Sequence, residues 1–143
     1  MKQLLITITA VVLVGCATTQ KPEPPIAKAP DILIQEAAFN GDIAAIKQHI
    51  AAGTDVNAAN EWGTTPLQIA ASMGHRHNHK KIVELLIAEG ADVNAKVVGD
   101  ANKGMTPLDL AIDSDNPNAS ARMADLLRKH GGKTGEELKA AEN

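Results

Sequence analysis

The chain has 143 residues, enough for one domain with a buried core, and 44% of them are hydrophobic. With one Phe, one Trp and no Tyr, that core has to be filled by Ala, Leu, Ile and Val, which favours closely stacked helices over a layered sheet. The net charge of −3 and the scarcity of aromatic residues argue against a protein that binds nucleic acid or an anionic membrane surface.

The first fifteen residues have the pattern of a secretory signal. Lys2 supplies a positive charge, and an apolar run of twelve residues follows at positions 4–15, LLITITAVVLVG. A membrane-spanning helix needs roughly 20 apolar residues, so this run is too short to cross a membrane on its own. We therefore expect residues 1–15 to be a signal peptide that is removed.

The apolar run leads into LVGC at residues 13–16, which resembles the lipobox of bacterial lipoproteins. The resemblance implies that Cys16, the single cysteine of the chain, receives diacylglycerol and anchors the protein in a membrane. Ala17 follows the cysteine where an Asp would favour the inner membrane, so the expected location is the outer membrane of a bacterial envelope, facing the periplasm. The alternative is an ordinary secretory signal that ends beside a cysteine by chance.

A proline-rich stretch separates the cysteine from the rest of the chain. Residues 17–30 read ATTQKPEPPIAKAP, with four prolines among charged and small residues. Such a composition cannot pack and adopts extended conformations, at about 3.1 Å per residue. We expect residues 16–30 to form a tether on the order of 40 Å long.

From residue 31 onward the chain repeats itself. Residues 36–58, EAAFNGDIAAIKQHIAAGTDVNA, match residues 69–95, and GTTPLQIAA at 63–71 recurs as GMTPLDLAI at 104–112. In each Thr-Pro pair the threonine can cap a helix that begins at the proline. Gly74 and Gly90 are expected to end the two helices of the second repeat with positive φ angles.

These repeats resemble the ankyrin repeat in their Thr-Pro-Leu start and their Gly-x-Asp-Val-Asn exit. The resemblance covers residues 31–132 and implies an all-α solenoid of about three helix-turn-helix units with hairpin loops between them. Residues 133–143 are expected to form a fraying C-terminal tail. Gln68 and Asp109 stand where the family often has His, which we expect to change the hydrogen bonds that bridge the turns and to soften the array.

Two groups of histidines need an explanation. His49 occupies a position where later repeats carry leucine, so we expect a half-buried, hydrogen-bonded core residue. His75, His77 and His79 lie between the helices of the second repeat, where the chain carries four extra residues. Gly-His at this turn is common in ankyrin repeats, which leaves His77 and His79 as surplus, and two or three imidazoles can bind zinc, copper or nickel. However, the run holds no carboxylate, and its Arg and Lys residues repel cations. A solvated loop with no cofactor is the prediction, and a periplasmic metal-binding protein is the alternative.

The resemblance also implies where a partner would bind. Ankyrin-repeat proteins usually bind other proteins on the concave face, formed by the hairpin tips and the first helix of each pair. The tips here are residues 59–63, ANEWG, and residues 96–104, KVVGDANKG, the second being four residues longer. An exposed Trp is a frequent anchor of interfaces, although an exposed aromatic without a partner is the alternative. The candidate partner-binding residues are Asn60, Glu61, Trp62, Lys96, Val97, Asp100 and Lys103.

No catalytic motif stands out in the sequence. The glycines follow the repeat and form no phosphate-binding loop, and no serine has the context of a nucleophile elbow. We expect a monomeric protein that is not an enzyme and does not bind nucleic acid. The leading hypothesis is a lipid-anchored adaptor, scaffold or inhibitor of the immunity type that binds an unidentified protein. A purely structural spacer is a further alternative.

Overall fold

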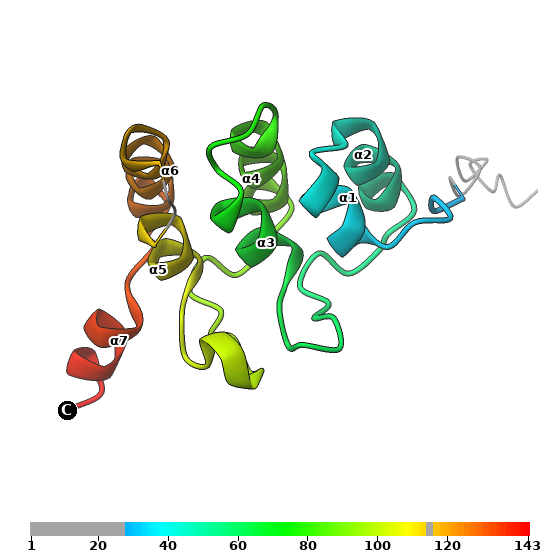
Figure 1. The fold of residues 1–143 in the computed structure, drawn as a ribbon. Coiled ribbons are helices and arrows are strands. Elements are labelled where there is room, and N and C mark those ends of the chain that lie inside the picture. Colours follow the sequence, from blue (N-terminus) through cyan, green and yellow to red (C-terminus); the bar gives the residue numbers. More distant parts are fainter. Residues whose placement is uncertain (1–27, 114–115) are drawn as a thin grey trace, which may run out of the picture.

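The computed structural model describes residues 28–113 and 116–143 (Figure 1). These residues form seven α-helices and one short 3₁₀ helix, with no strand among them, so the all-α prediction is confirmed. Residues 1–27, with the expected signal peptide, Cys16 and most of the tether, lie outside the described residues. The elements are α1 (Ile34–Asn40), α2 (Ile43–Ala51), α3 (Pro66–Ser72), α4 (His79–Ala88), η1 (Asp100–Asn102), α5 (Pro107–Ile112), α6 (Pro117–Lys129) and α7 (Gly135–Ala141).

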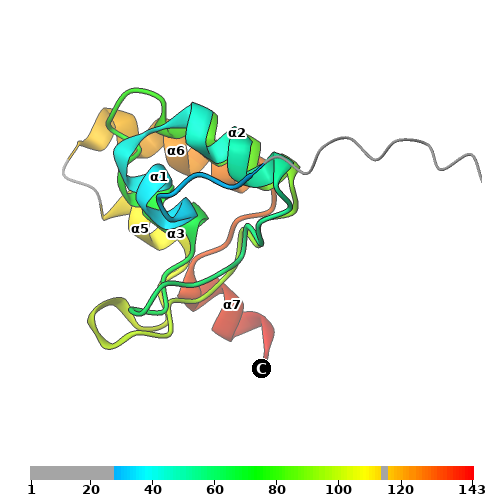
Figure 2. The same ribbon diagram turned by 90° about the vertical axis from the view of Figure 1, so that its right-hand side faces the viewer.

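The helices α1 to α6 form three pairs that stack side by side (Figure 1). The first helices, α1, α3 and α5, contact one another in one layer, and α2, α4 and α6 form the second layer. The hairpins that join successive pairs project to one side of these layers (Figure 2). The structure therefore confirms the predicted solenoid of three helix-turn-helix units.

The Thr-Pro pairs begin α3 and α5 as expected. Thr65 accepts a hydrogen bond from the backbone N–H of Gln68, and the Gln68 side chain accepts one from the Thr65 N–H in return. Thr106 and Asp109 form the same reciprocal pair at α5. Each capping arrangement satisfies two backbone donors at the helix start, where no carbonyl of the helix can reach them.

Glycines end some of the helices, but Gly74 has another role. Gly41 after α1 and Gly90 after α4 have φ angles of 76° and 88°, which side chains disfavour. Gly74 has no positive φ; the positive φ in this loop belongs to Asn78, at 73°. A Cβ on Gly74 would lie 2.9 Å from Cε of Met123 on α6. The prediction for Gly74 was wrong, because this glycine serves the close approach of two repeats.

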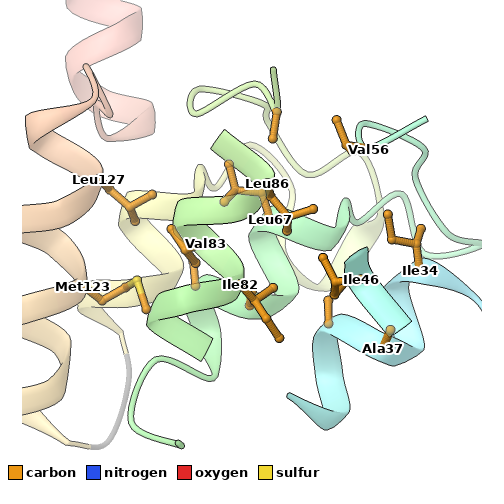
Figure 3. Packing of buried hydrophobic residues seen from close by; sticks show 14 of the residues in the cluster. Ile34, Ala37, Ile46, Val56, Leu67, Ile82, Val83, Leu86, Met123 and Leu127 are labelled. Carbon is orange, nitrogen blue, oxygen red and sulfur yellow. The ribbon is translucent and has the colours of Figure 1, made fainter. Parts of the chain in front are cut away.

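The core lies between the two layers and runs through all three pairs (Figure 3). Full burial of one such aliphatic side chain contributes about 1.5–3 kcal/mol, and helices of 6 to 13 residues need this packing because they are marginal alone. Alanines on α1 and α3, fully buried, let the first helices approach closely. The largest fully buried aliphatic side chains are Ile46, Leu67, Ile82, Leu86, Leu108, Met123 and Leu127.

Side-chain amides connect one repeat to the next. Asn57 donates to the Gly90 carbonyl at 3.1 Å and accepts from the Asp92 N–H at 2.8 Å, and Asn94 repeats this arrangement one unit later. Gln68 is fully buried and donates to the Ala95 carbonyl at 2.8 Å. Gln68 therefore makes a bridging hydrogen bond between successive repeats, and the softening of the array stays a prediction.

The C-terminal residues form a helix, so the expectation of a fraying tail was wrong. Thr134 caps α7 in a capping box with Glu137, and the Gly135 N–H donates to Oδ2 of Asp109 at 2.8 Å. The Thr106 hydroxyl also donates to the Lys133 carbonyl at 2.7 Å. These hydrogen bonds join the residues at the start of α7 to the start of α5. Over residues 28–113 and 116–143, none of the helices is long and apolar enough to span a bilayer.

Candidate interaction surface

The first hairpin tip is a tight turn that displays Trp62. The side-chain carbonyl of Asn60 accepts from the backbone N–H groups of Trp62 and Thr64, at 3.1 and 3.0 Å. Gly63 completes the turn with a φ of 68°. Trp62 is 66% exposed, as predicted, while Asn60 has its carbonyl oxygen engaged in holding the turn. Asn60 is therefore a positioning residue for Trp62.

The second tip is a longer loop that folds back on itself. The N–H of Val97 donates to the Met105 carbonyl at 2.9 Å, and the Gly104 N–H donates to the Val97 carbonyl at 2.9 Å. Val97 is only 4% exposed but lines a pocket between the two tips, so its role as a partner-binding residue stays a prediction. Its side chain faces inward because the paired backbone alternates its side chains, and the neighbouring Val98 is 74% exposed instead.

The charged candidates on the second tip differ in their surroundings. Lys96 forms an ion pair with Glu142 at 3.5 Å, just beyond α7. Asp100 and Lys103 are exposed at the tip, as is Glu61 on the first tip. The exposed charges of Glu61, Asp100 and Lys103 can orient a partner. The ion pair of Lys96 connects the second tip to the end of α7.

The two tips contact each other through their backbones. The Val98 N–H donates to the Gly63 carbonyl at 3.3 Å. Gly99 packs directly against the Trp62 carbonyl, and a Cβ on Gly99 would overlap that oxygen. The close approach fixes the first tip against the second, so the position of Trp62 depends on a glycine in the next hairpin.

Trp62 separates two open pockets on the concave side. A pocket of about 580 Å³ lies between the two tips, and one of about 790 Å³ lies between the first tip and helices α1 and α3. Ile69 on α3 lines both. We name the larger pocket the α1–α3 groove; its apolar lining residues include Leu33, Phe39, Ala59, Trp62, Ile69 and Met73.

The groove contains apolar residues that the sequence analysis did not select. Leu33 is 68% exposed and Phe39 is 45% exposed, although both are apolar and neighbour the buried face of α1. Arg76 lies over the Phe39 ring at 5.7 Å from its centre, within the range of a cation–π contact. The sequence contained a signal for their exposure. Leu33 and Phe39 lie outside the helical face formed by the buried residues Ile34, Ala37 and Ala38.

The three clustered histidines do not assemble into one site. His79 is 1% exposed, and its two ring nitrogens lie 3.1 Å from the carbonyl oxygens of His77 and Phe39. His75 and His77 are exposed. Within the described residues no group of three His, Cys, Asp or Glu side chains could hold a metal ion. The expectation of a solvated loop was wrong for His79, which belongs to the core.

His49 has the role that the sequence predicted. It is 4% exposed, with Nε2 lying 2.8 Å from the Ile32 carbonyl oxygen and Nδ1 lying 3.2 Å from the Thr54 hydroxyl. The imidazole thus connects α2 to the segment before α1 and to the turn that follows. It is more deeply buried than the half-buried position we expected.

Comparison with known proteins decides the family. A family model for ankyrin repeats matches three copies over residues 34–135, most of the chain. The chain belongs to the ankyrin-repeat family. Such repeats act as protein–protein interaction modules.

Individual relatives match shorter stretches of the chain. The chain is 49% identical over 57 residues to alpha-latrocrustotoxin-Lt1a of Latrodectus tredecimguttatus, which covers 40% of this chain and 4% of the toxin. It is 33% identical over 84 residues to an ankyrin repeat protein of fowlpox virus, covering 59% of this chain and 11% of that protein. An ankyrin repeat-containing protein of Schizosaccharomyces pombe is 34% identical over 72 residues, 50% of this chain and 31% of that protein. The chain spans less than a third of each relative's length.

Proposed function

We propose that this chain is a lipid-anchored ankyrin-repeat module of the bacterial envelope that binds another protein through the α1–α3 groove and the adjoining tips. One observation carries the proposal: large apolar side chains are exposed around one groove. Leu33, Phe39 and Trp62 all line it, and each is at least 45% exposed. Exposed apolar side chains gathered around a groove are typical of an interaction site.

The geometry also supports binding to a preformed surface. Trp62 is held by the Asn60 turn and by Gly99, so little conformational freedom remains to be lost when a partner covers it. An aromatic anchor of this kind contributes about 2 kcal/mol or more when it is buried at the centre of an interface. The module would then act by binding, as an adaptor, scaffold or inhibitor of the immunity type, without catalysis.

The anchor rests on the sequence of the N-terminal region. LVGC at residues 13–16 places the single cysteine where a lipoprotein would be modified, and the proline-rich residues 17–30 separate it from the repeats. Several acyl chains on Cys16 would give stable membrane attachment, with the groove held away from the lipid surface. The outer membrane, facing the periplasm, is the proposed location.

Affinity capture tests the groove. The tagged chain is recovered from detergent-solubilised envelopes as wild type, as Trp62→Ala and as Lys47→Ala, a control at an exposed position on α2. We expect a protein that is captured by wild type and control and is lost with Trp62→Ala. If Trp62→Ala captures the same proteins in the same amounts as wild type, the groove is not the binding surface.

Membrane fractionation tests the anchor separately. Wild type should incorporate labelled palmitate and partition with membranes, whereas Cys16→Ser should do neither. Equal membrane recovery and equal labelling of Cys16→Ser would exclude lipidation at this residue. Because the repeats do not contain Cys16, this result leaves the groove proposal untouched.

A further inference from the structure

A further pocket lies at the opposite edge of the solenoid from the hairpin tips. It has a volume of about 220 Å³ and lies between the loop of residues 73–78, which joins α3 to α4, and the first turns of α6. In Figure 1 this loop rises above α4, whereas the tips point the other way. The pocket has different lining residues from the α1–α3 groove, although Arg76 in the pocket lies over the Phe39 ring of the groove.

Positive side chains surround this pocket. Arg76, Lys80 and Arg122 line it together with the imidazoles of His75 and His77, and no carboxylate is among the described residues that line it. The ion pairs found in residues 28–113 and 116–143 use other cations. Lys81, the neighbour of Lys80, differs from the pocket residues because it forms an ion pair with Glu84 at 3.6 Å.

The start of α4 adds to this positive potential. Asn78 precedes the helix but gives it no side-chain cap: its φ of 73° is left-handed rather than extended, and its side-chain amide donates to the Gly41 carbonyl at 3.3 Å. The first backbone N–H groups of α4 are therefore left without a capping side chain, and Lys80 lies in this first turn. A helix start carries a partial positive charge, which favours an anion at this position.

We propose that this pocket binds a phosphate group. Its volume would hold about seven water molecules at about 30 Å³ each, so a phosphate group and part of its substituent fit. Two guanidinium groups can each donate paired hydrogen bonds to phosphate oxygens, and an ammonium group adds a further donor. The same positive charges repel a metal cation, so the pocket favours an anion rather than the metal ion considered for its histidines.

The phosphate could belong to a free phosphorylated compound or to a phospholipid headgroup. The shared chemistry is a tetrahedral oxyanion that carries negative charge. The test uses the full-length chain in maltoside micelles, titrated with inorganic phosphate and followed by the NMR shifts of the His77 and Lys80 amides. The same chain is then mixed with vesicles of phosphatidylglycerol or of phosphatidylcholine.

The pocket variant is Lys80→Gln with Arg122→Gln, and the control is Lys47→Gln with Lys129→Gln. All four side chains are exposed, and both double variants remove the same net charge, so neither should prevent folding. We expect saturable binding of phosphate to wild type and control, weakened at least about tenfold in the pocket variant, the effect of losing one charge-assisted hydrogen bond. An equal loss in both variants, or shifts that never saturate, would overturn the proposal.

The vesicles identify the source of the phosphate. If phosphatidylglycerol vesicles retain less of the pocket variant than of the control, the site takes a lipid headgroup. If both variants bind the vesicles equally while only the pocket variant loses inorganic phosphate, the site takes a free phosphorylated compound. The N-terminal region is identical in all variants, so its own affinity for lipid cancels in the comparison.

Discussion

Single polar side chains hold this fold together at buried positions. His79 is buried between α1 and the α3–α4 loop, with carbonyl oxygens facing both ring nitrogens. Replacement by alanine leaves a cavity and removes a donor from buried carbonyl groups. We expect His79→Ala to lower the free energy of unfolding by about 2–4 kcal/mol, measured by urea denaturation.

The neighbouring histidines provide the control for His79. His75 and His77 are exposed, so their alanine variants should stay within about 0.5 kcal/mol of wild type. Similar stability losses for all three variants would contradict the assignment of His79 to the core. Such a result would mean that all three histidines of the loop contribute to stability, and not the buried His79 ring alone.

Gln68 supports the array at the same scale. Its side chain accepts from the Thr65 N–H and donates to the Ala95 carbonyl, both at 2.8 Å. We expect Gln68→Met, which keeps the volume but pairs neither group, to lower the free energy of unfolding by about 1–3 kcal/mol. The matched control is Gln48→Met at an exposed position on α2, where unfolding should occur at nearly the wild-type urea concentration. An unchanged midpoint for Gln68→Met would show that the bridge contributes nothing.

At the scale of elements, the two hairpin tips behave as one unit. Gly99→Ala would place a Cβ onto the Trp62 carbonyl, so the tips have to separate and the Val98–Gly63 hydrogen bond should break. The single Trp provides the measurement: its fluorescence anisotropy should fall as the first tip becomes mobile. Ala101→Ser on the exposed surface of η1 should keep the wild-type value. If Gly99→Ala has the same anisotropy as wild type, the turn around Asn60 is sufficient by itself to hold Trp62 in place.

The cap of α7 depends on pH through Glu137. The backbone N–H of Thr134 donates to its carboxylate and lowers its pKa below the ordinary value of 4.5, and Arg128 acts in the same direction. The stabilisation is present above pH 4.5 and is lost as the pH falls through the lower value of the folded protein. We expect the NMR signal of the Thr134 amide to shift as the pH falls below 4.5, through the lowered pKa of Glu137. Glu137→Gln should remove this shift, and an unchanged pH profile in that variant would contradict the assignment.

At the scale of the whole molecule, stability comes from the stacking of repeats. Gly74 and Met123 belong to successive repeats and lie in close contact, with a Cβ at Gly74 only 3.1 Å from the Met123 Cβ. Gly74→Ala restricts the unfolded chain, a gain of about 0.4–1 kcal/mol, but the crowding against a side chain that is 1% exposed costs about 1–3 kcal/mol. We therefore expect net destabilisation in thermal or urea unfolding.

A double variant identifies the cause of this loss. Met123→Ala removes the Cε that lies 2.9 Å from the new Cβ but keeps the Met123 Cβ at 3.1 Å, so Gly74→Ala should cost less in that background than in wild type. If the loss is the same in both backgrounds, the crowding between repeats is not its source.

The sequence by itself determined the repeat, its three units and the helix starts. Thr65 with Pro66 and Thr106 with Pro107 are local signals, because a cap involves residues three positions apart. The exposure of Trp62 was also predictable, since the repeat pattern places it at a hairpin tip, between Glu61 and Gly63.

The tertiary structure alone decided which residues face a neighbouring repeat. His79 is buried by α1, forty positions earlier, and Leu33 and Phe39 join Trp62 in one groove only when the hairpin folds beside α1. The helix at 135–141 has a local signal in the capping box of Thr134 and Glu137, but its place beside α5 depends on the hydrogen bonds that Asp109 and Thr106 make to the residues at its start. Local periodicity carries no information on these contacts, because burial depends on residues that come close only after the repeats have stacked.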